Sequence, residues 1–145
     1  MYAVSRIGWL LAFLAARPLD RIRLTKAMFM LWYRHRRRLD DYFSFVPYLY
    51  GPFSSQLYVA LNQALESGLV AQPPSADERY ARYYLTPKGK RALTSVADLM
   101  PADLDGEVRA LAEWASSTSV NELLRTVYRS APEYASNSIV RDKVR

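Results

Sequence analysis

The sequence contains no cysteine, and this absence removes several kinds of chemistry. Disulfide bonds, thiol nucleophiles and cysteine-ligated metal sites are excluded, because each needs a cysteine side chain. Histidine is almost as scarce, since His35 is the only one among 145 residues. Most zinc-type sites use two or more His or Cys ligands, so we expect this protein to bind no metal ion.

Phosphate-binding glycine loops are also missing, because the five glycines are scattered singly along the chain. His35 lies among arginines, and no nearby serine completes a nucleophilic set with it. Asp103, Asp105 and Glu107 lack the spacing of a calcium loop, and acidic side chains near the start of a helix explain them more simply. We therefore expect neither catalysis nor a cofactor.

The longest apolar run, residues 7–16 (IGWLLAFLAA), is too short to cross a membrane. A spanning helix needs about 20 residues. The run follows Arg6, as in a signal peptide, but Arg17 and Pro18 would fit poorly after a cleavage site. We interpret it as a buried first helix, and we expect a cytoplasmic protein with no membrane partner.

The charge is unevenly distributed along the chain. The sequence has 20 basic and 14 acidic residues, which gives a formal net charge of +6. Residues 1–38 contain nine basic side chains and one acidic side chain, whereas residues 98–122 contain six acidic and one basic. Such an asymmetry could orient the molecule on DNA with its basic face inward, or could pair two subunits head to tail.

Capping residues divide the chain into helices and one β-hairpin. Pro18 ends a first helix, and Asp20 can cap a second. A third helix starts at Ser54 or Ser55 and stops at Gly68, a residue that readily adopts the left-handed conformation of a helix end. The helices around it are predicted at 3–16, 21–38, 87–99, 107–116 and 119–129, and the two strands of the hairpin at 69–71 and 80–85.

The predicted fold class is mainly α with a small β-hairpin, as a winged helix-turn-helix with additional C-terminal helices. We expect one domain over residues 1–136, with a core at 20–99, C-terminal helices at 101–135, and a flexible tail at 137–145. The aromatic connection at 42–53 should pack between the second and third helices; an alternative is a platform on which bases stack.

Two phrases bracket the hairpin, Leu65–Val70 (LESGLV) and Arg82–Arg91 (RYYLTPKGKR). They resemble the same two phrases around the wing of winged-helix regulators of the PadR and MarR type. A wider resemblance, to the bacterial YwgA-like family, is carried by RLTKAMF at 23–29, FVPYLYGPFS at 45–54, ELLRTVY at 122–128 and PEYASNS at 132–138. The Tyr-Gly-Pro stretch is similar, more weakly, to the Panacea domain of phage-associated antitoxins. These resemblances imply a winged helix in a toxin–antitoxin or phage-defence setting, and no catalytic residue.

Polar and basic side chains at three places are candidates for nucleic-acid contact: the third helix, the wing with the turn after it, and the end of the second helix. Asn and Gln can read adenine edges, and Arg and Lys can bind phosphates. Each place also has a simpler interpretation. The third helix lacks cations and could be an ordinary solvated face, and the wing carries Asp77 and Glu78 and could be a solvated hairpin. The arginines at the end of the second helix are favoured there by the helix dipole. The candidates are Arg34, Arg36, Arg37, Arg38, Ser55, Gln56, Asn62, Gln63, Arg79, Arg82, Lys88, Lys90 and Arg91.

These candidates lead to two hypotheses. The first is a DNA-binding transcriptional regulator that contacts double-stranded DNA as a homodimer. Its pairing surface would lie on the C-terminal helices, at Trp114, Leu123, Leu124, Val127 and Tyr128. The second is a protein-interaction module, either an antitoxin or a subunit of a phage-defence complex, which the cation-free third helix and the aromatic connection favour. The two are compatible, since antitoxins often repress their own promoters.

Overall fold

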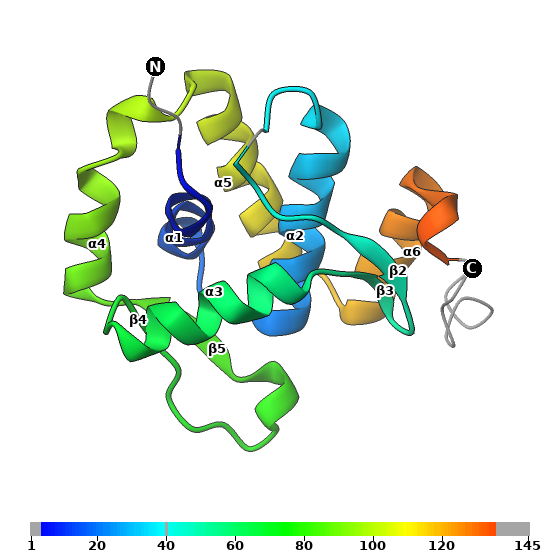
Figure 1. Ribbon diagram of the computed structural model, residues 1–145. Helices are drawn as coiled ribbons and strands as arrows, with labels where there is room; N and C mark the ends of the chain where they lie inside the picture. The colour runs from blue at the N-terminus through cyan, green and yellow to red at the C-terminus, as the bar shows by residue number, and fades with distance from the viewer. Residues whose placement is uncertain (1–3, 40, 136–145) are drawn as a thin grey trace.

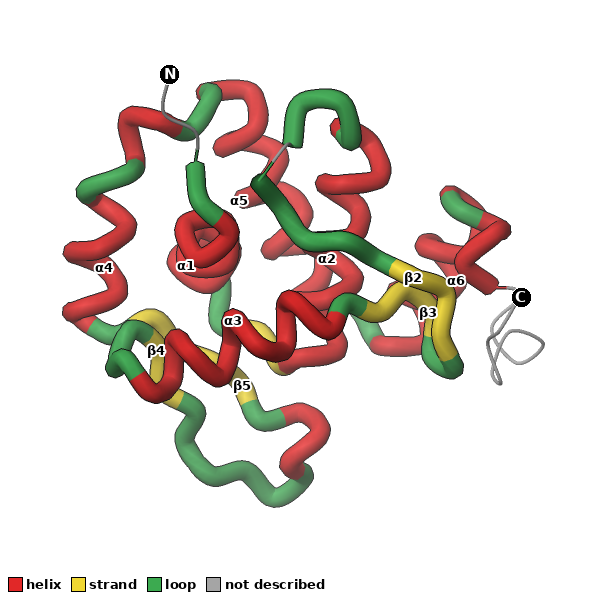
Figure 2. The backbone as a smooth tube through the Cα atoms, in the orientation of Figure 1, coloured by secondary structure: helices red, strands yellow, loops and turns green. Residues whose placement is uncertain are grey.

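A computed structural model describes residues 4–39 and 41–135. The predicted fold class is confirmed: the chain is mainly helical with a small antiparallel sheet (Figures 1 and 2). The helices are α1 (Arg6–Ala16), α2 (Arg21–His35), α3 (Ser55–Glu66), α4 (Pro87–Thr94), α5 (Ala102–Ser117) and α6 (Val120–Ser130). The strands are β1 (Leu19–Asp20), β2 (Val46–Tyr48), β3 (Gly51–Phe53), β4 (Val70–Ala71) and β5 (Arg82–Leu85), and the 3-10 helices are η1 (Glu78–Tyr80), η2 (Ala97–Leu99) and η3 (Pro132–Ala135).

The capping residues act as their sequence positions predict. The Asp20 carboxylate accepts a hydrogen bond from the Arg23 backbone N–H at 3.1 Å and begins α2. Ser54 accepts from the Leu57 N–H at 3.2 Å and begins α3. Gly68 follows α3 with a φ of 74°, which is the left-handed conformation that a glycine adopts without strain.

The small sheet has the strand order β1-β5-β4, and all of its pairs are antiparallel. Leu19 of β1 pairs with Tyr83 of β5, and Val70 of β4 pairs with Leu85. The strand β1 was not predicted, because two residues give no alternating pattern. With it, the order α1–β1–α2–α3–β4–β5 places a three-stranded sheet beside three helices, and the segment between β4 and β5 is the wing (Figure 2).

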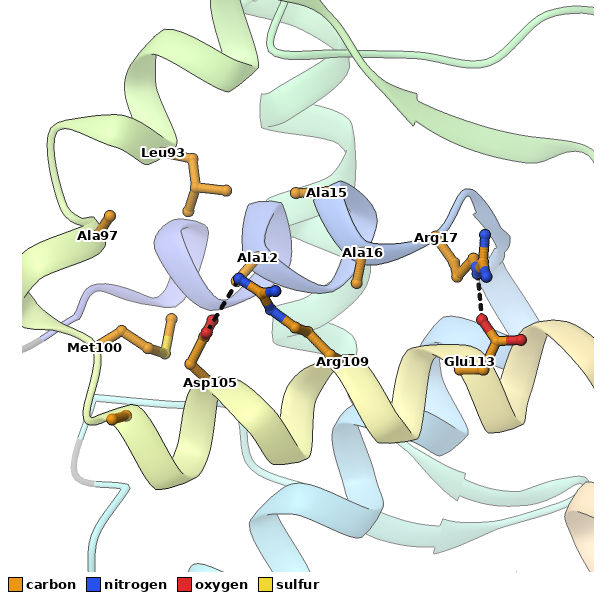
Figure 3. A pocket seen from close by; sticks show the side chains of 11 residues that line it. Ala12, Ala15, Ala16, Arg17, Leu93, Ala97, Met100, Asp105, Arg109 and Glu113 are labelled. Carbon is orange, nitrogen blue, oxygen red and sulfur yellow. Dashed lines mark hydrogen bonds and ion pairs between the residues drawn. The ribbon is translucent and has the colours of Figure 1, made fainter.

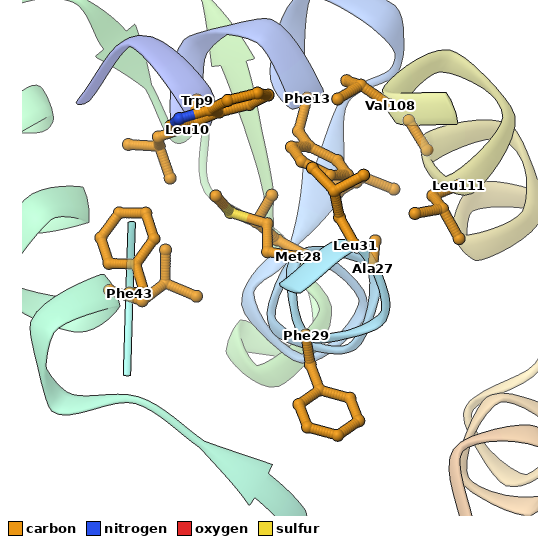
Figure 4. Packing of buried hydrophobic residues seen from close by; sticks show 14 of the residues in the cluster. Trp9, Leu10, Phe13, Ala27, Met28, Phe29, Leu31, Phe43, Val108 and Leu111 are labelled. Atoms are coloured by element: carbon orange, nitrogen blue, oxygen red, sulfur yellow. The ribbon is translucent and has the colours of Figure 1, made fainter. Parts of the chain in front are cut away.

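The core is continuous from one end of the described chain to the other, and α1 runs through its centre (Figure 1). Phe13 of α1 and Leu31 of α2 are fully buried and lie beside Val108 and Leu111 of α5 (Figure 4). On the far side of α2, Phe29 meets Tyr134 of η3 with ring centroids 4.6 Å apart. The C-terminal helices therefore supply part of the main core.

Several predicted boundaries are wrong. The helix α2 ends at His35 rather than Arg38, because the chain turns there with an Arg38 N–H bonded to the His35 carbonyl at 2.9 Å. The helix α4 ends at Thr94 rather than Leu99, and η2 follows it. In contrast, α5 begins at Ala102, before the predicted 107, so Asp103 and Asp105 do lie in a helical first turn.

The aromatic connection between α2 and α3 contains a second hairpin, β2–β3, in which Val46 pairs with Phe53. The connection was predicted to pack between the second and third helices, and Tyr42, Phe43 and Phe45 are indeed buried. Phe45 meets Phe29 of α2, but Tyr42 meets Trp9 of α1. At the tip of the hairpin, however, Tyr48, Leu49 and Tyr50 are exposed.

Among the described residues, no helix combines the length and apolar character needed to span a membrane. The tail predicted for residues 137–145 lies outside the described part of the chain.

Candidate nucleic-acid interface

The helix α3 buries one side and presents a polar side to solvent. Its inward residues Leu57 and Leu61 are almost completely buried. Ser55, Asn62 and Gln63, which the sequence assigns to base contact, are exposed. Val59 lies between them and is 55% exposed, so the face also carries an apolar group that could contact a thymine methyl.

Gln56 is the exception among the residues predicted on α3. It is half-buried, and its side-chain oxygen accepts a hydrogen bond from the Ser44 backbone N–H at 2.7 Å. This contact ties the connection before the β2–β3 hairpin to the first turn of α3. Gln56 therefore positions the helix, and only its amide NH₂ remains for another contact.

The wing holds one predicted cation that is already neutralised. Arg79 of η1 donates hydrogen bonds to both carboxylate oxygens of Asp77, at 3.1 and 2.8 Å. These bonds lower the pKa of the Asp77 carboxyl and raise the pKa of Arg79. Arg82 of β5 differs: it is exposed on the side of the strand opposite the buried Tyr83, and no carboxylate pairs with it in the described part of the chain.

The start of α4 is fastened to the end of α3. Thr86 caps α4 by accepting from the Gly89 N–H at 3.0 Å, and its hydroxyl donates to the Gly68 carbonyl at 2.6 Å. Lys88 Nζ donates to the Ser67 carbonyl at 2.7 Å, so this predicted phosphate contact already satisfies a helix end. A Cβ on Gly89 would lie 2.1 Å from the carbonyl oxygen of Leu69, so only glycine permits this close packing.

Lys90 and Arg91 continue along α4 as exposed cations. Neither forms an ion pair with a described carboxylate. Together with Arg82 they belong to β5 and α4, and the turn between these two elements is bonded to the residue after α3 through Thr86 and Gly68 (Figure 1). The structure therefore places three unneutralised cations on the two elements that adjoin the C-terminal end of α3.

The arginine cluster after α2 lies elsewhere. Figure 1 shows α2 running away from α3, so that its C-terminal end is at the opposite side of the molecule from the wing. There Arg34 pairs with Glu107 at 3.1 Å, and Arg38 pairs with Asp103 at 2.6 Å. The Arg38 guanidinium lowers the pKa of the Asp103 carboxyl to about 2. Two of the four predicted arginines are thus bound to α5.

The other two arginines of the cluster are less constrained. The Arg36 guanidinium lies over the rings of Trp32 and Tyr33, at 5.5 and 4.7 Å from their centroids. Arg37 is exposed, and no described carboxylate is paired with it. Because of their position, Arg36 and Arg37 are not on the surface that α3 and the wing form.

The charge asymmetry of the sequence is balanced inside one chain. In addition to the pairs at the end of α2, Arg17 forms an ion pair with Glu113 of α5 (Figure 3). Basic residues before Arg38 therefore meet acidic residues of α5 in the same molecule. Neither a field oriented toward DNA nor head-to-tail pairing is needed to explain the asymmetry.

The predicted subunit interface is wrong for its central residues. Leu123, Leu124 and Val127 are 0%, 4% and 0% exposed, because α6 turns them toward the core beside α2 and the β2–β3 hairpin. Trp114 and Tyr128 are partly buried against the same core. Their periodic apolar pattern marks an inward helix face, and a homodimer would have to use other residues.

A hollow of about 750 Å³ lies between α1, α4, η2 and α5 (Figure 3). Its walls are mostly alanine, leucine and methionine side chains. Its charged groups pair with each other: Arg17 with Glu113, and Asp105 with Arg109 at 3.3 Å. Across the described residues, no group of three or more His, Asp or Glu side chains could hold a metal ion. This hollow presents no set of reactive groups.

Two basic residues near the wing were not predicted from sequence. The Arg23 guanidinium lies 5.9 Å from the ring centroid of Tyr80, and that of Arg21 lies 4.7 Å from the centroid of Tyr58. Lys26, one turn further along α2, is buried. A cation inside the apolar run TKAMFML was the available signal for Lys26.

No family model matches the sequence, and no curated protein matches it. The resemblances to known families that the sequence suggested therefore stay predictions.

Proposed function

We propose that this protein binds double-stranded DNA, with α3 in the major groove and the wing along the phosphate backbone, as a transcriptional regulator. The observation that carries the proposal is the arrangement at one end of the molecule. There α3 exposes Asn62 and Gln63, and the adjoining β5 and α4 carry the exposed Arg82, Lys90 and Arg91, which have no described carboxylate partner.

The chemistry of these residues divides into two tasks. The amides of Asn62 and Gln63 can each form two hydrogen bonds with an adenine edge, which specifies sequence. The guanidinium and ammonium groups around them can bind phosphates, which supplies affinity that falls as salt rises. Because α3 itself carries Glu66 and no cation, we expect the affinity to depend on the flanking residues.

Fluorescence anisotropy at two salt concentrations tests the proposal, with a labelled duplex from upstream of the protein's own gene and a scrambled duplex of equal length. We expect tighter binding to the first duplex, and weaker binding to both at the higher salt. If neither duplex binds at low salt, the proposal is overturned.

Substitutions on α3 separate base reading from phosphate contact. Asn62→Ala with Gln63→Ala should remove the preference for the upstream duplex and leave binding to the scrambled duplex nearly unchanged. A matched control is Ser117→Ala with Thr118→Ala, which removes polar groups at the end of α5. An unchanged preference in the α3 variant would show that α3 does not read bases.

A second candidate function is a protein-interaction module, such as an antitoxin or a subunit of a defence complex. The observation that favours it is the tip of the β2–β3 hairpin, where large apolar side chains face solvent. Val46, Tyr48, Leu49 and Tyr50 are 52%, 52%, 42% and 57% exposed. Neighbouring exposed apolar groups of this kind often mark a protein interface.

Light scattering during size-exclusion chromatography tests whether the hairpin tip pairs two copies. If it does, Leu49→Ser with Tyr50→Ser should convert a dimer into a monomer. If the unaltered protein is already monomeric, copurification from the native host with and without these substitutions tests for another partner. Recovery of the same proteins with both forms would remove the tip as an interface.

A further inference from the structure

A cavity of about 440 Å³ lies between α2, the β2–β3 hairpin with the start of α3, η1 of the wing and the start of α6. One wall is aromatic: the rings of Tyr48 and Phe53 have centroids 5.2 Å apart, and Phe53 meets Tyr58 edge-on at 4.9 Å. Sites for small molecules are commonly about 300–1,000 Å³ in volume and mostly apolar, with a few polar groups. This cavity has that size and that kind of lining.

The charged groups in the cavity wall all have one sign. Arg21, Lys26 and Arg79 line the cavity, and no carboxylate does among its described residues. The Arg21 guanidinium lies over the Tyr58 ring, and Arg79 is bound to Asp77, which is not part of the wall. The cavity therefore favours an anionic ligand.

Lys26 is the unusual member of this set, because its side chain is only 5% exposed. Its ammonium group donates to the Pro52 carbonyl at 3.2 Å, which is its only hydrogen-bond acceptor among the described residues. An ammonium has three N–H donors, and a buried charge is costly unless it is paired. Burial lowers the pKa of Lys26 to about 8, and the nearby Asp20 acts in the opposite direction.

Asp20 does not neutralise Lys26 on its own, since its carboxylate already accepts hydrogen bonds from Arg23 at 2.8 and 3.1 Å. An anion in the cavity would give the Lys26 ammonium the ion-pair partner that the described residues do not supply there. We propose that the cavity binds a small carboxylate with an apolar body, whose oxygens accept hydrogen bonds from Lys26 and whose body packs on Phe53 and Tyr58.

A ligand bound there would also touch the wing. Tyr80 and Arg79 belong to η1 and form one side of the cavity, while α2 and the hairpin form the other sides. A ligand that contacts both sides stabilises the position of η1 in which they close on it. This inference does not depend on DNA binding, because occupancy of the cavity can be measured with the protein alone.

Chemical-shift titration of ¹⁵N-labelled protein tests the proposal, with benzoate and hexanoate as probes and benzyl alcohol and hexanol as their neutral matches. We expect each carboxylate to bind at least tenfold more tightly than its alcohol, with shifts centred on the hairpin and η1. Absence of binding by both carboxylates, or equal binding of acids and alcohols, would overturn the proposal.

Two substitutions test which charge in the cavity produces the preference for a carboxylate over its alcohol. Lys26→Met keeps the length of the side chain and should abolish the preference for the acid over the alcohol. Asn121→Asp adds a negative charge to the cavity rim at the start of α6, where an acidic residue suits the helix, and should weaken carboxylate binding several-fold. If both variants keep the preference of the unaltered protein, the carboxylate is not bound here.

The titration of Lys26 supplies a readout that a purely structural lysine would not give. Its ¹³Cε shift should report a pKa near 8 in the free protein and a higher pKa when benzoate is saturating, because an adjacent anion favours the ammonium form. A pKa that benzoate leaves unchanged would contradict the contact. The other ionisable or charged groups that surround it are Asp20, Arg21, Tyr48, Tyr50, Tyr58, Arg79 and Tyr80.

Discussion

The two ends of this molecule are both rich in basic residues, yet they differ in where the opposite charges lie. At the C-terminal end of α2, Arg34 and Arg38 meet carboxylates of α5. At the end formed by α3, the wing and α4, Lys90 and Arg91 are exposed without a described carboxylate partner. The density of cations in the sequence therefore does not show which of them remain unpaired; the distance to the nearest acid in the fold does.

The largest effect that we expect is on the free energy of unfolding, and it compares one glycine from each end of the molecule. Gly89→Ala should lower the free energy of unfolding by about 3 kcal/mol or more, because the new methyl group would overlap the Leu69 carbonyl beneath α4. Gly106→Ala, at an open position in α5, should raise it by about 0.5–1 kcal/mol, as alanine favours a helix. Urea unfolding of both variants measures this difference. Equal destabilisation would mean that the tight contact at Gly89 is absent.

The next largest effect on the free energy of unfolding is expected at Lys26, the buried lysine of α2. Lys26→Met should raise the free energy of unfolding at pH 7 by about 1–3 kcal/mol, because it removes a buried charge. The loss of the hydrogen bond to Pro52 offsets part of this gain. The pKa of Lys26 is lower in the folded state than its usual 10.5, so the unfolded state binds more protons between pH 8 and 10.5. The unaltered protein should therefore gain stability relative to the variant as pH rises through this window.

Denaturant unfolding of the Lys26→Met protein and of the unaltered protein at pH 7 and pH 10 measures this change. Lys90→Met provides a control for the loss of an exposed lysine, and its difference from the unaltered protein should vary little with pH. A stability difference for Lys26→Met that is the same at both pH values would contradict the lowered pKa.

The affinity for DNA should distinguish the two basic ends of the molecule directly. Lys90→Ala with Arg91→Ala should weaken DNA binding about tenfold or more, and should reduce the slope of log affinity against log salt by about 1.8. Arg36→Ala with Arg37→Ala removes the same amount of charge at the other end, where α3 and the wing do not reach. Anisotropy titrations over a salt series decide between them. If the second pair has the larger effect, DNA lies at the end of α2.

The smallest effect is expected from the surface ion pairs at the C-terminal end of α2. Although Arg38 lowers the pKa of Asp103, both side chains are exposed, and the coupling in such surface pairs is small. A double-mutant cycle with Arg38→Ala and Asp103→Ala should give a small coupling that declines in high salt. A coupling that is insensitive to salt would show that the pair is not screened by solvent.

The wing and the helices around it follow from local sequence signals. Asp20, Gly68 and Thr86 each act over three or four residues, so their effects are visible without knowledge of the fold. The exposed side of α3 is predictable for the same reason, because the spacing of Leu57 and Leu61 marks its opposite side.

The features that the sequence did not reveal depend on contacts between distant segments. The strand β1 exists because Leu19 lies beside Tyr83, and the end of α2 is neutralised because α5 packs along it. The cavity around Lys26 is assembled from four separate segments. The burial of Leu123 and Val127 likewise needs the position of α6, since an apolar helix face fits an inner core and a subunit interface equally well.

The continuity of the core has a consequence for the order of events during synthesis. Tyr134 packs on Phe29 and donates a hydrogen bond to the Phe45 carbonyl at 3.3 Å, so one of the last described residues completes a cluster that begins in α2. A nascent chain that stops before α6 leaves this cluster open to water. We expect the earlier helices and the wing to remain incompletely packed on the ribosome until the segment through Ala135 has emerged. During that interval the exposed apolar side chains can be bound by chaperones.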